Sequence, residues 1–126
     1  IGGLAGAAIA HLMFDLPALE LGSKVRSGPG QWLGEAVATF ALVLTILGTA
    51  RHRPQWLPIA VAAVITAGYW FTSSTSFANP AITVARSLTD SFSGIRPVDV
   101  PGFILAQLGG ALLAGWLGGW LFDQHR

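Results

Sequence analysis

The stretch TSSTSFANPAITVARSLTD, residues 72–90, is polar and lies between two long apolar segments, residues 56–71 and 101–122. Five hydroxyl residues in a row, 72–76, precede an Asn-Pro-Ala triplet, and an arginine follows it. Apolar segments of about 20 residues are typical of membrane spans, and we interpret both neighbouring segments as spans. The role of the polar insert therefore decides which kind of membrane protein this sequence encodes.

The composition makes the membrane the expected surroundings of this chain. Of its 126 residues, 52% are hydrophobic and 10% are charged, whereas soluble domains carry about 25% charged residues. The net charge of +1 predicts no nucleic-acid partner. Cysteine is absent, which excludes disulfides, zinc–thiolate sites and thiol chemistry. The three histidines, His11, His52 and His125, lack metal-ligand spacing, so we expect neither a metal nor a cofactor.

The apolar segments divide the chain into one partial span and three complete ones. Residues 1–14, IGGLAGAAIAHLMF, would form a helix of about 21 Å, shorter than the hydrocarbon core of about 30 Å. We interpret them as the end of a helix that begins before this fragment. A polar loop follows at 15–30, and the complete spans are expected at 31–50, 56–71 and 101–122.

The short basic loop RHRPQ, residues 51–55, predicts the orientation of the spans. Short loops rich in arginine remain on the cytoplasmic side of a membrane. Counting spans from this loop puts the C-terminus in the cytoplasm. Residues 15–30 and 72–100 then belong to the outer side, although Lys24 and Arg26 in the outer loop oppose this charge bias.

Because both neighbouring spans open to the outer side, the insert must begin and end there. Its inner part, AITVARSLTDSF, has 12 residues and would be about 18 Å long as a helix, which is too short to cross the core. Asn79 is a favoured N-cap, and Pro80 suits a first helical position. We predict a re-entrant segment that descends over 72–78, turns at Asn79 near the midplane and returns as a half-helix. The residues alone also fit a capped helix lying on the outer surface.

A half-helix that begins inside a narrow pore would select solutes by charge and hydrogen bonding. The N-terminus of a helix carries about half a positive charge, which repels cations. The Asn79 amide can donate to a solute oxygen, and the carbonyls of residues 74–78 can accept from a solute. This lining favours small uncharged molecules that form hydrogen bonds.

The segment FANPAITVARSLTD, together with GEAVATF at the start of an earlier span, resembles the aquaporin and glyceroporin family, the major intrinsic proteins. Asn79, Pro80 and Ala81 resemble the second of its two Asn-Pro-Ala motifs. The resemblance covers nearly the whole chain and implies an all-α membrane protein, an aquaporin-like right-handed bundle of inverted repeats. The fragment would hold the tail of the third span and the second repeat, which has three spans and one re-entrant half-helix at 72–92.

The resemblance also implies what this fragment needs in order to work. The missing N-terminal half of the same chain would supply the first Asn-Pro-Ala motif and the rest of the pore. Members of this family assemble as homotetramers with one pore in each subunit. We therefore expect a multi-pass protein of the cell membrane, in a bacterial inner membrane, whose partners are the lipid bilayer and small neutral solutes.

Glu35 is a carboxylate within an expected span, and such residues usually face a partner in the protein interior. The glutamate at the matching family position accepts hydrogen bonds from the re-entrant backbone, and the resemblance implies this loop-supporting role for Glu35. The alternative is a glutamate that stays hydrated near the outer interface. Gln107 in the last span is a second candidate, either as a similar polar contact or as a packing residue.

The position directly after the triplet departs from the usual family pattern. Most members have an arginine there, which narrows the outer pore, whereas this sequence has Ile82. The nearest arginine is Arg86. It could fold back into the filter, form a helix-surface ion pair with Asp90 four residues later, or anchor the loop.

Spacing places two further residues of the selectivity filter. Ser76 is three residues before Asn79, and Ala67 is twelve residues before it, with Gly68 as the alternative. The fourth filter position lies in the missing half. Small and apolar side chains at these positions imply a filter that is wider and less polar than a strict water filter.

The pattern NPAITVARSLTDSFSGIRP resembles the branch of the family found with bacterial arsenic-resistance genes. The leading hypothesis is a passive channel for water, glycerol-like polyols and undissociated arsenous acid. One alternative is a coupled secondary transporter with a broken-helix binding site, for which Glu35 is the candidate carboxylate. Another is a non-conducting truncated membrane scaffold. Without paired acids, a serine–histidine arrangement or a metal cluster, the sequence does not indicate an enzyme.

Overall fold

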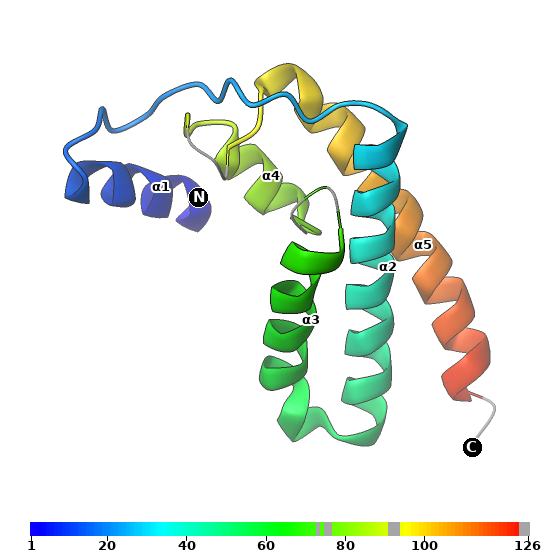
Figure 1. Ribbon diagram of the computed structural model, residues 1–126. Helices are drawn as coiled ribbons and strands as arrows, with labels where there is room; N and C mark the ends of the chain where they lie inside the picture. The colour runs from blue at the N-terminus through cyan, green and yellow to red at the C-terminus, as the bar shows by residue number, and fades with distance from the viewer. Residues whose placement is uncertain (73, 75–76, 91–93, 124–126) are drawn as a thin grey trace.

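The computed structural model describes residues 1–72, 74, 77–90 and 94–123, and these residues form helices and connecting segments (Figure 1). The α-helices are α1 (Gly2–Met13), α2 (Pro29–His52), α3 (Leu57–Phe71), α4 (Pro80–Arg86) and α5 (Val100–Asp123). Short 3₁₀ turns, Pro54–Trp56 and Pro97–Asp99, lead into α3 and α5. The described residues contain no β-strand, so the chain has the all-helical architecture that the sequence predicts.

Two helical stretches are long and apolar enough to cross a membrane, Pro29–His52 and Pro97–Phe122. They contain the expected spans at 31–50 and 101–122. The expected span at 56–71 falls on α3, which has 15 residues and is about 22 Å long. α1 is a shorter apolar helix of 12 residues.

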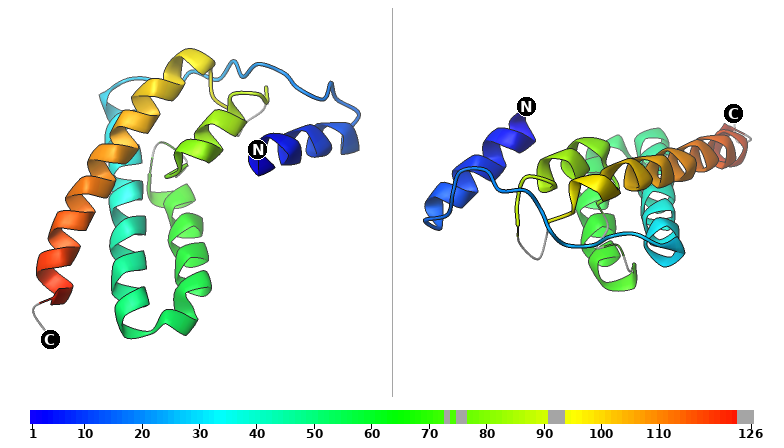
Figure 2. Two further views of the ribbon diagram at one scale, coloured as in Figure 1. Left: turned by 180° about the vertical axis from the view of Figure 1, so that it is seen from behind. Right: turned by 90° about the horizontal axis from the view of Figure 1, so that it is seen from above.

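The pair α2 and α5 forms the centre of the structure, and α3 lies beside α2 after a tight connection (Figures 1 and 2). Small residues let the two long helices approach closely. A Cβ atom added at Gly110 of α5 would lie 2.3 Å from the carbonyl oxygen of Ala36 on α2. A Cβ atom at Gly118 would lie 2.6 Å from the side chain of Leu47. Such contacts are typical of helices that associate in lipid through backbone proximity.

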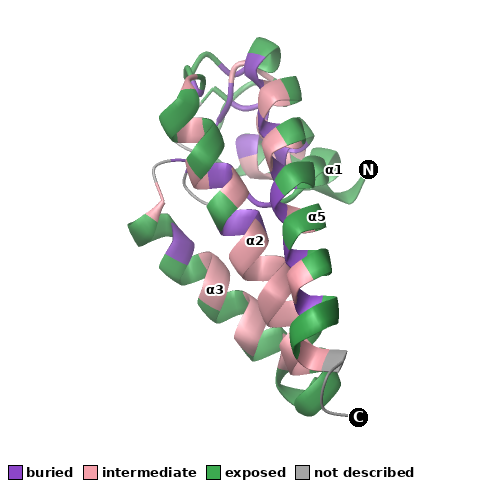
Figure 3. Cartoon of the chain, turned by 90° about the vertical axis from the view of Figure 1, so that its right-hand side faces the viewer, coloured by how far each residue is buried: buried purple, intermediate pink, exposed green. Residues whose placement is uncertain are grey.

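Most large apolar residues are exposed rather than buried in a core, and exposed residues line much of each long helix (Figure 3). In the most apolar windows of the two long helices, only 17% and 22% of the residues are buried. The buried residues include several polar ones instead, among them Arg26, Glu35, Thr83 and Gln107. An apolar exterior around a polar interior is expected when lipid replaces water as the solvent, because a water-exposed surface of this kind would promote association.

The segment 14–28 crosses the end of the α2–α5 pair where α4 also lies (Figures 1 and 2). Main-chain hydrogen bonds join it to the residues after α4. The Gly22 N–H donates to the Ser87 carbonyl at 2.8 Å, and the Arg96 N–H donates to the Lys24 carbonyl at 3.0 Å. The segment 14–28 therefore covers the C-terminal end of α4.

The predicted half-helix of 12 residues, 81–92, was wrong in length, because α4 ends at Arg86. The carbonyl groups at its end are taken by donors from other segments. The Arg86 carbonyl accepts from the Ile95 N–H at 3.2 Å, and the Ser87 carbonyl accepts from Gly22. Gly22 fits because it has no side chain, since a Cβ atom there would lie 2.2 Å from the Ile95 carbonyl oxygen.

Candidate functional site

The start of α4 is fixed by Asn79 and Pro80. Asn79 has an extended backbone, with φ −159° and ψ 119°, and its Oδ1 accepts from the Ala81 N–H at 2.8 Å and from the Ile82 N–H at 3.3 Å. Pro80 occupies the first helical turn, where its missing N–H leaves no hydrogen bond unmade. The predicted N-cap is therefore formed. The Asn79 side chain is exposed, so its NH₂ group can donate to another molecule.

Ala78 makes the turn that precedes this cap. Its φ is 50°, a left-handed conformation that is uncommon for residues other than glycine. The Ala78 N–H donates to Oε1 of Glu35 on α2. Such backbone strain persists only where surrounding contacts hold it, and Glu35 provides a contact of this kind.

Glu35, Gln107 and Thr83 form a buried network behind the turn. Gln107 Nε2 of α5 donates to Glu35 Oε1 at 2.7 Å and to Thr83 Oγ1 at 2.8 Å. The Thr83 hydroxyl in turn donates to the Asn79 carbonyl at 2.8 Å. All three side chains are at most 1% exposed. The network thus joins α2 and α5 to both sides of the Asn79 cap.

The network lies well inside the length of the two long helices. Glu35 is in the second turn of α2, and Gln107 is at the end of the second turn of α5. With a rise of 1.5 Å per residue, both are about 10 Å from the starts of their helices. The start of α4 therefore lies between α2 and α5, and it contacts both of them at this depth.

The expected filter residues that the structure describes do not line one common groove. Ile82 is 38% exposed and, with Arg86, lines a groove of about 500 Å³ between α1 and α4. Ala67 is exposed on α3 and is not among the residues that line this groove, while Gly68 is buried. Ser76 lies outside the described residues.

Arg86 does not form the helix-surface ion pair with Asp90 that was one hypothesis for it. Because α4 ends at Arg86, Asp90 does not share its helix. The Asp90 carboxylate accepts instead from the main-chain N–H of Ser23, at 3.3 Å, and from the Ser23 hydroxyl. The half-buried Arg86 guanidinium lies over the Phe77 ring, 4.5 Å from its centroid. This contact is a cation–π interaction.

Sequence reasoning missed the site contribution of Arg26 and treated it only as a charge in the outer loop. Arg26 is 1% exposed, and its guanidinium also lies over the Phe77 ring, 4.8 Å from the centroid. Its Nε donates to the Gly94 carbonyl at 2.7 Å, and Nη1 donates to the Ser74 carbonyl at 3.3 Å. Phe77 also packs against the Phe103 ring, edge-on at 5.3 Å between centroids. Arg26 therefore contacts the insert at the Ser74 carbonyl and the Phe77 ring.

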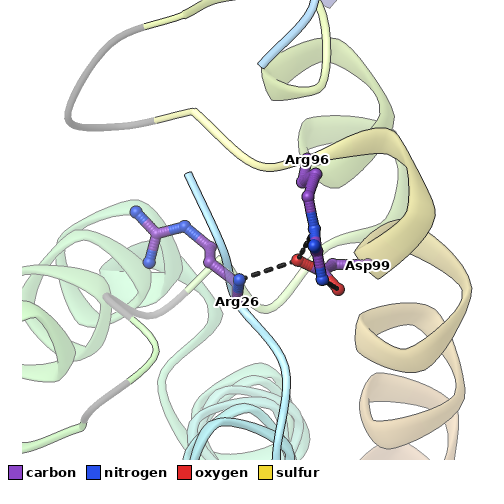
Figure 4. A network of polar contacts seen from close by, with 3 residues as sticks. All are labelled: Arg26, Arg96 and Asp99. Carbon is purple, nitrogen blue, oxygen red and sulfur yellow. Dashed lines mark hydrogen bonds and ion pairs between the residues drawn. The ribbon is translucent and has the colours of Figure 1, made fainter. Parts of the chain in front are cut away.

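Asp99 holds the backbone of Arg26 at the start of α5 (Figure 4). Its Oδ2 accepts from the Arg26 main-chain N–H at 2.8 Å and from Arg96 Nε at 3.0 Å, while Oδ1 accepts from Arg96 Nη2 at 2.9 Å. The bond to Asp99 raises the pKa of Arg96. The guanidinium of Arg26 points away from Asp99. Burial and the nearby positive charge of Arg86 lower the pKa of Arg26.

The two histidines that the structure describes, His11 and His52, do not share a site. His11 is buried and connects α1 to the segments around it, with Nε2 2.7 Å from Thr89 Oγ1 and Nδ1 2.9 Å from the Ala18 carbonyl. His52 is exposed at the other end of the molecule, and His125 lies outside the described residues. Among the residues that the structure describes, no group of three or more histidine, aspartate or glutamate side chains could hold a metal ion.

Comparison with known proteins identifies the family. A curated protein, the aquaglyceroporin AqpS of Rhizobium meliloti (strain 1021), is 57% identical to this chain over 125 residues. This match supports membership of the aquaporin and glyceroporin family. The match covers 99% of the chain but 54% of the relative, so the chain spans about half of the aquaglyceroporin and corresponds to its C-terminal half. No protein-family model and no solved structure matches the chain.

The family assignment confirms the resemblance that the Asn-Pro-Ala segment indicated. It makes the chain part of a membrane protein, in agreement with its two long apolar helices. Aquaglyceroporins are channels for small neutral solutes rather than enzymes. The buried network around Asn79 is therefore the candidate site of an aquaglyceroporin-like chain.

Proposed function

We propose that this chain forms the C-terminal half of a passive channel for small neutral solutes in a bacterial inner membrane. The observation that carries the proposal is the capped start of α4, held between α2 and α5 by Glu35, Gln107 and Thr83. A surface helix would not need three buried polar side chains behind its first turn. These contacts favour the re-entrant segment over the interfacial helix.

Selection in this channel rests on charge and on the width of the outer filter. The start of α4 carries partial positive charge that disfavours cations, and the NH₂ group of Asn79 donates to a passing solute oxygen. Ile82 provides an apolar filter wall where an arginine would narrow the path. The residues expected at the other filter positions, Ala67 and Ser76, have small side chains, so we propose glycerol, water and undissociated arsenous acid as the solutes.

Glu35 has the role of a loop support rather than a transport carboxylate. A coupled transporter needs an intramembrane carboxylate that is free to change its protonation or bind an ion. Oε1 of Glu35 already accepts from Ala78 and Gln107, and the residue is fully buried. This engagement supports passive conduction.

The remaining architecture follows the family. α2, α3 and α5 serve as the fourth, fifth and sixth spans, α1 is the end of the third, and 72–92 is the re-entrant segment. The N-terminal half of the protein completes the pore, four subunits assemble, and the C-terminus faces the cytoplasm. The basic loop between α2 and α3 supports this orientation.

Stopped-flow light scattering tests the proposal. Proteoliposomes with the full-length protein are compared with empty liposomes for the entry of water, glycerol and arsenous acid, and proton flux is followed in parallel. Fast entry of glycerol or arsenous acid without proton flux is the expected result. Absence of all solute flux from folded protein, or solute entry coupled to protons, would contradict a passive channel.

A further inference from the structure

The residues assigned so far account for the outer part of the solute path. Glu35 holds the backbone just before the Asn79 cap, and it lies about 10 Å from the start of α2. α2 has 24 residues and is about 36 Å long, so most of this helix extends beyond the cap. A solute that passes Asn79 therefore still has to move along the second half of α2 before it leaves the membrane.

A groove of about 590 Å³ lies at the far end of α2, where this helix connects to α3 (Figure 1). We call it the inner groove, because this end faces the cytoplasm in the orientation that we propose. Thr45, Thr49, His52 and Arg53 provide its polar lining, and Trp56 also lines it. A water molecule occupies about 30 Å³ in the liquid, so the inner groove has room for several of them.

The polar lining distinguishes the inner groove from other grooves along α2. A groove between α2 and α5 near Val37 is lined by apolar residues and glycines. Another, near Leu47, has Arg51 as the one charged or polar side chain in its described lining. The inner groove instead carries two hydroxyls within an apolar helix. Polar side chains inside a membrane usually face the protein interior or a water-filled cavity, so these hydroxyls indicate a polar path rather than a lipid contact.

The hydroxyls of Thr45 and Thr49 have no hydrogen-bond partner among the residues that the structure describes, and both residues are half-buried. A threonine hydroxyl in an apolar helix can donate to the carbonyl four residues earlier. Thr66 of α3 does so, and its Oγ1 donates to the Ala62 carbonyl at 2.8 Å. Because a hydroxyl without a partner is unfavourable in apolar surroundings, Thr45 and Thr49 require water or a solute hydroxyl in the groove.

Both threonines also lie on the side of α2 that carries Glu35. Because an α-helix turns about 100° for each residue, Thr49 is about 40° and Thr45 about 80° from Glu35 around the helix axis. Thr45 is about 10 Å and Thr49 about 5 Å from the end of α2 at His52. The two hydroxyls are therefore successive polar positions between the level of the Asn79 cap and the connection to α3.

We propose that the inner groove is the inner segment of the solute path, and that Thr45 and Thr49 exchange hydrogen bonds there with water and polyols. A hydroxyl both donates and accepts, which matches neutral solutes whose own hydroxyls do the same. Two neutral hydroxyls provide no charge that would hold a cation, and the exposed Arg53 of the same groove is itself a cation. The inference rests on the proposed channel function and adds solute-contacting residues on the side of Asn79 opposite Ile82.

Substituted cysteines test this path in proteoliposomes of the full-length protein, because this chain has no cysteine of its own. Thr45→Cys and Thr49→Cys are treated with a small, charged, membrane-impermeant methanethiosulfonate reagent. Labelling is read as a mass shift, and glycerol entry is followed by light scattering. We expect both variants to be labelled and then to lose most of their glycerol flux, since the charged adduct fills the groove. The wild type, treated with the same reagent, gives the baseline for any other thiol.

Leu47→Cys is the matched control, because it lies at the same depth of α2 on another side. It is about 120° from Glu35 in the opposite sense to the two threonines. A Cβ atom added at Gly118 of α5 would lie 2.6 Å from the Leu47 side chain, so this residue packs against α5. Leu47→Cys should remain unlabelled and keep its glycerol flux.

The outcomes separate the inner groove from the channel as a whole. Thr49→Cys that stays unlabelled, or that is labelled without loss of flux, would overturn the inner groove as the path. Labelling of Leu47→Cys as fast as that of Thr49→Cys would also overturn it, because the reagent would then reach this end of α2 from every side. A wild type without flux of any neutral solute would overturn the proposed function itself, even if Thr49→Cys is labelled. If Thr45→Cys does not insert, Thr49→Cys decides, because it lies nearer the end of α2.

Discussion

Replacing Glu35 with glutamine should destabilise the channel by about 2 kcal/mol, although it keeps the shape of the side chain. Oε1 of Glu35 accepts two hydrogen bonds, from the Ala78 N–H and from Gln107 Nε2. A hydrogen bond to a charged group contributes about 1.5–3 kcal/mol, and a neutral one about 0.5–1.5 kcal/mol. Each of the two bonds therefore loses about 1 kcal/mol in Glu35→Gln.

Two smaller effects of Glu35→Gln oppose each other. Oε2 is buried and has no hydrogen-bond partner within the described residues, so an NH₂ group at this position would be an unpaired donor. Removing a buried charge, on the other hand, removes its desolvation penalty. Because these effects have opposite signs, the loss of the two charge-assisted bonds sets the estimate. Glycerol flux should also fall, since Ala78 and the Asn79 cap are held less firmly.

Reversible unfolding of the full-length protein in mixed detergent and dodecyl sulfate micelles measures the change in stability. The five tryptophans of the chain provide the fluorescence signal. Thr39→Val, one turn further along α2, is the matched control. Thr39 is buried, and its hydroxyl lacks a partner in the described part of the chain, so this variant should be as stable as the wild type or more stable. Equal stability and flux of Glu35→Gln and Thr39→Val would refute the reasoning.

Three further changes test other parts of the site. Gln107→Leu removes two buried hydrogen bonds, one of them to Glu35. It should lower the free energy of unfolding by about 2 kcal/mol in the same assay. A variant as stable as the wild type would show that the network is dispensable. Gly22→Ala brings a Cβ atom to 2.2 Å from the Ile95 carbonyl oxygen. This clash should destabilise the folded protein by about 1–3 kcal/mol. An unchanged unfolding curve would contradict this prediction. Ile82→Arg should narrow the filter, so that glycerol flux falls more than water flux in light scattering; wild-type glycerol flux in an inserted variant would count against the filter position.

Several features of this protein are local, and the sequence predicts them well. Asn79 and Pro80 mark the start of α4 because the cap needs only hydrogen bonds to the N–H groups two and three residues later. The two long helices follow from continuous apolar segments of membrane length. Glu35 is conspicuous in the sequence because a carboxylate in such a segment requires a partner, and the structure gives it two donors.

Other features depend on residues that are far apart in the chain. Nothing near Arg26 in the sequence indicates that its guanidinium is buried against Phe77, because Gly94 and Ser74, its acceptors, come from other segments. The early end of α4 has the same cause, since Gly22 and Ile95 take the carbonyls that would continue the helix. Local hydrogen bonds and apolar length can be read from neighbouring residues. The position of a buried charge and the end of a short helix were decided by tertiary structure, because their energy depends on which distant donors and acceptors the fold brings within reach.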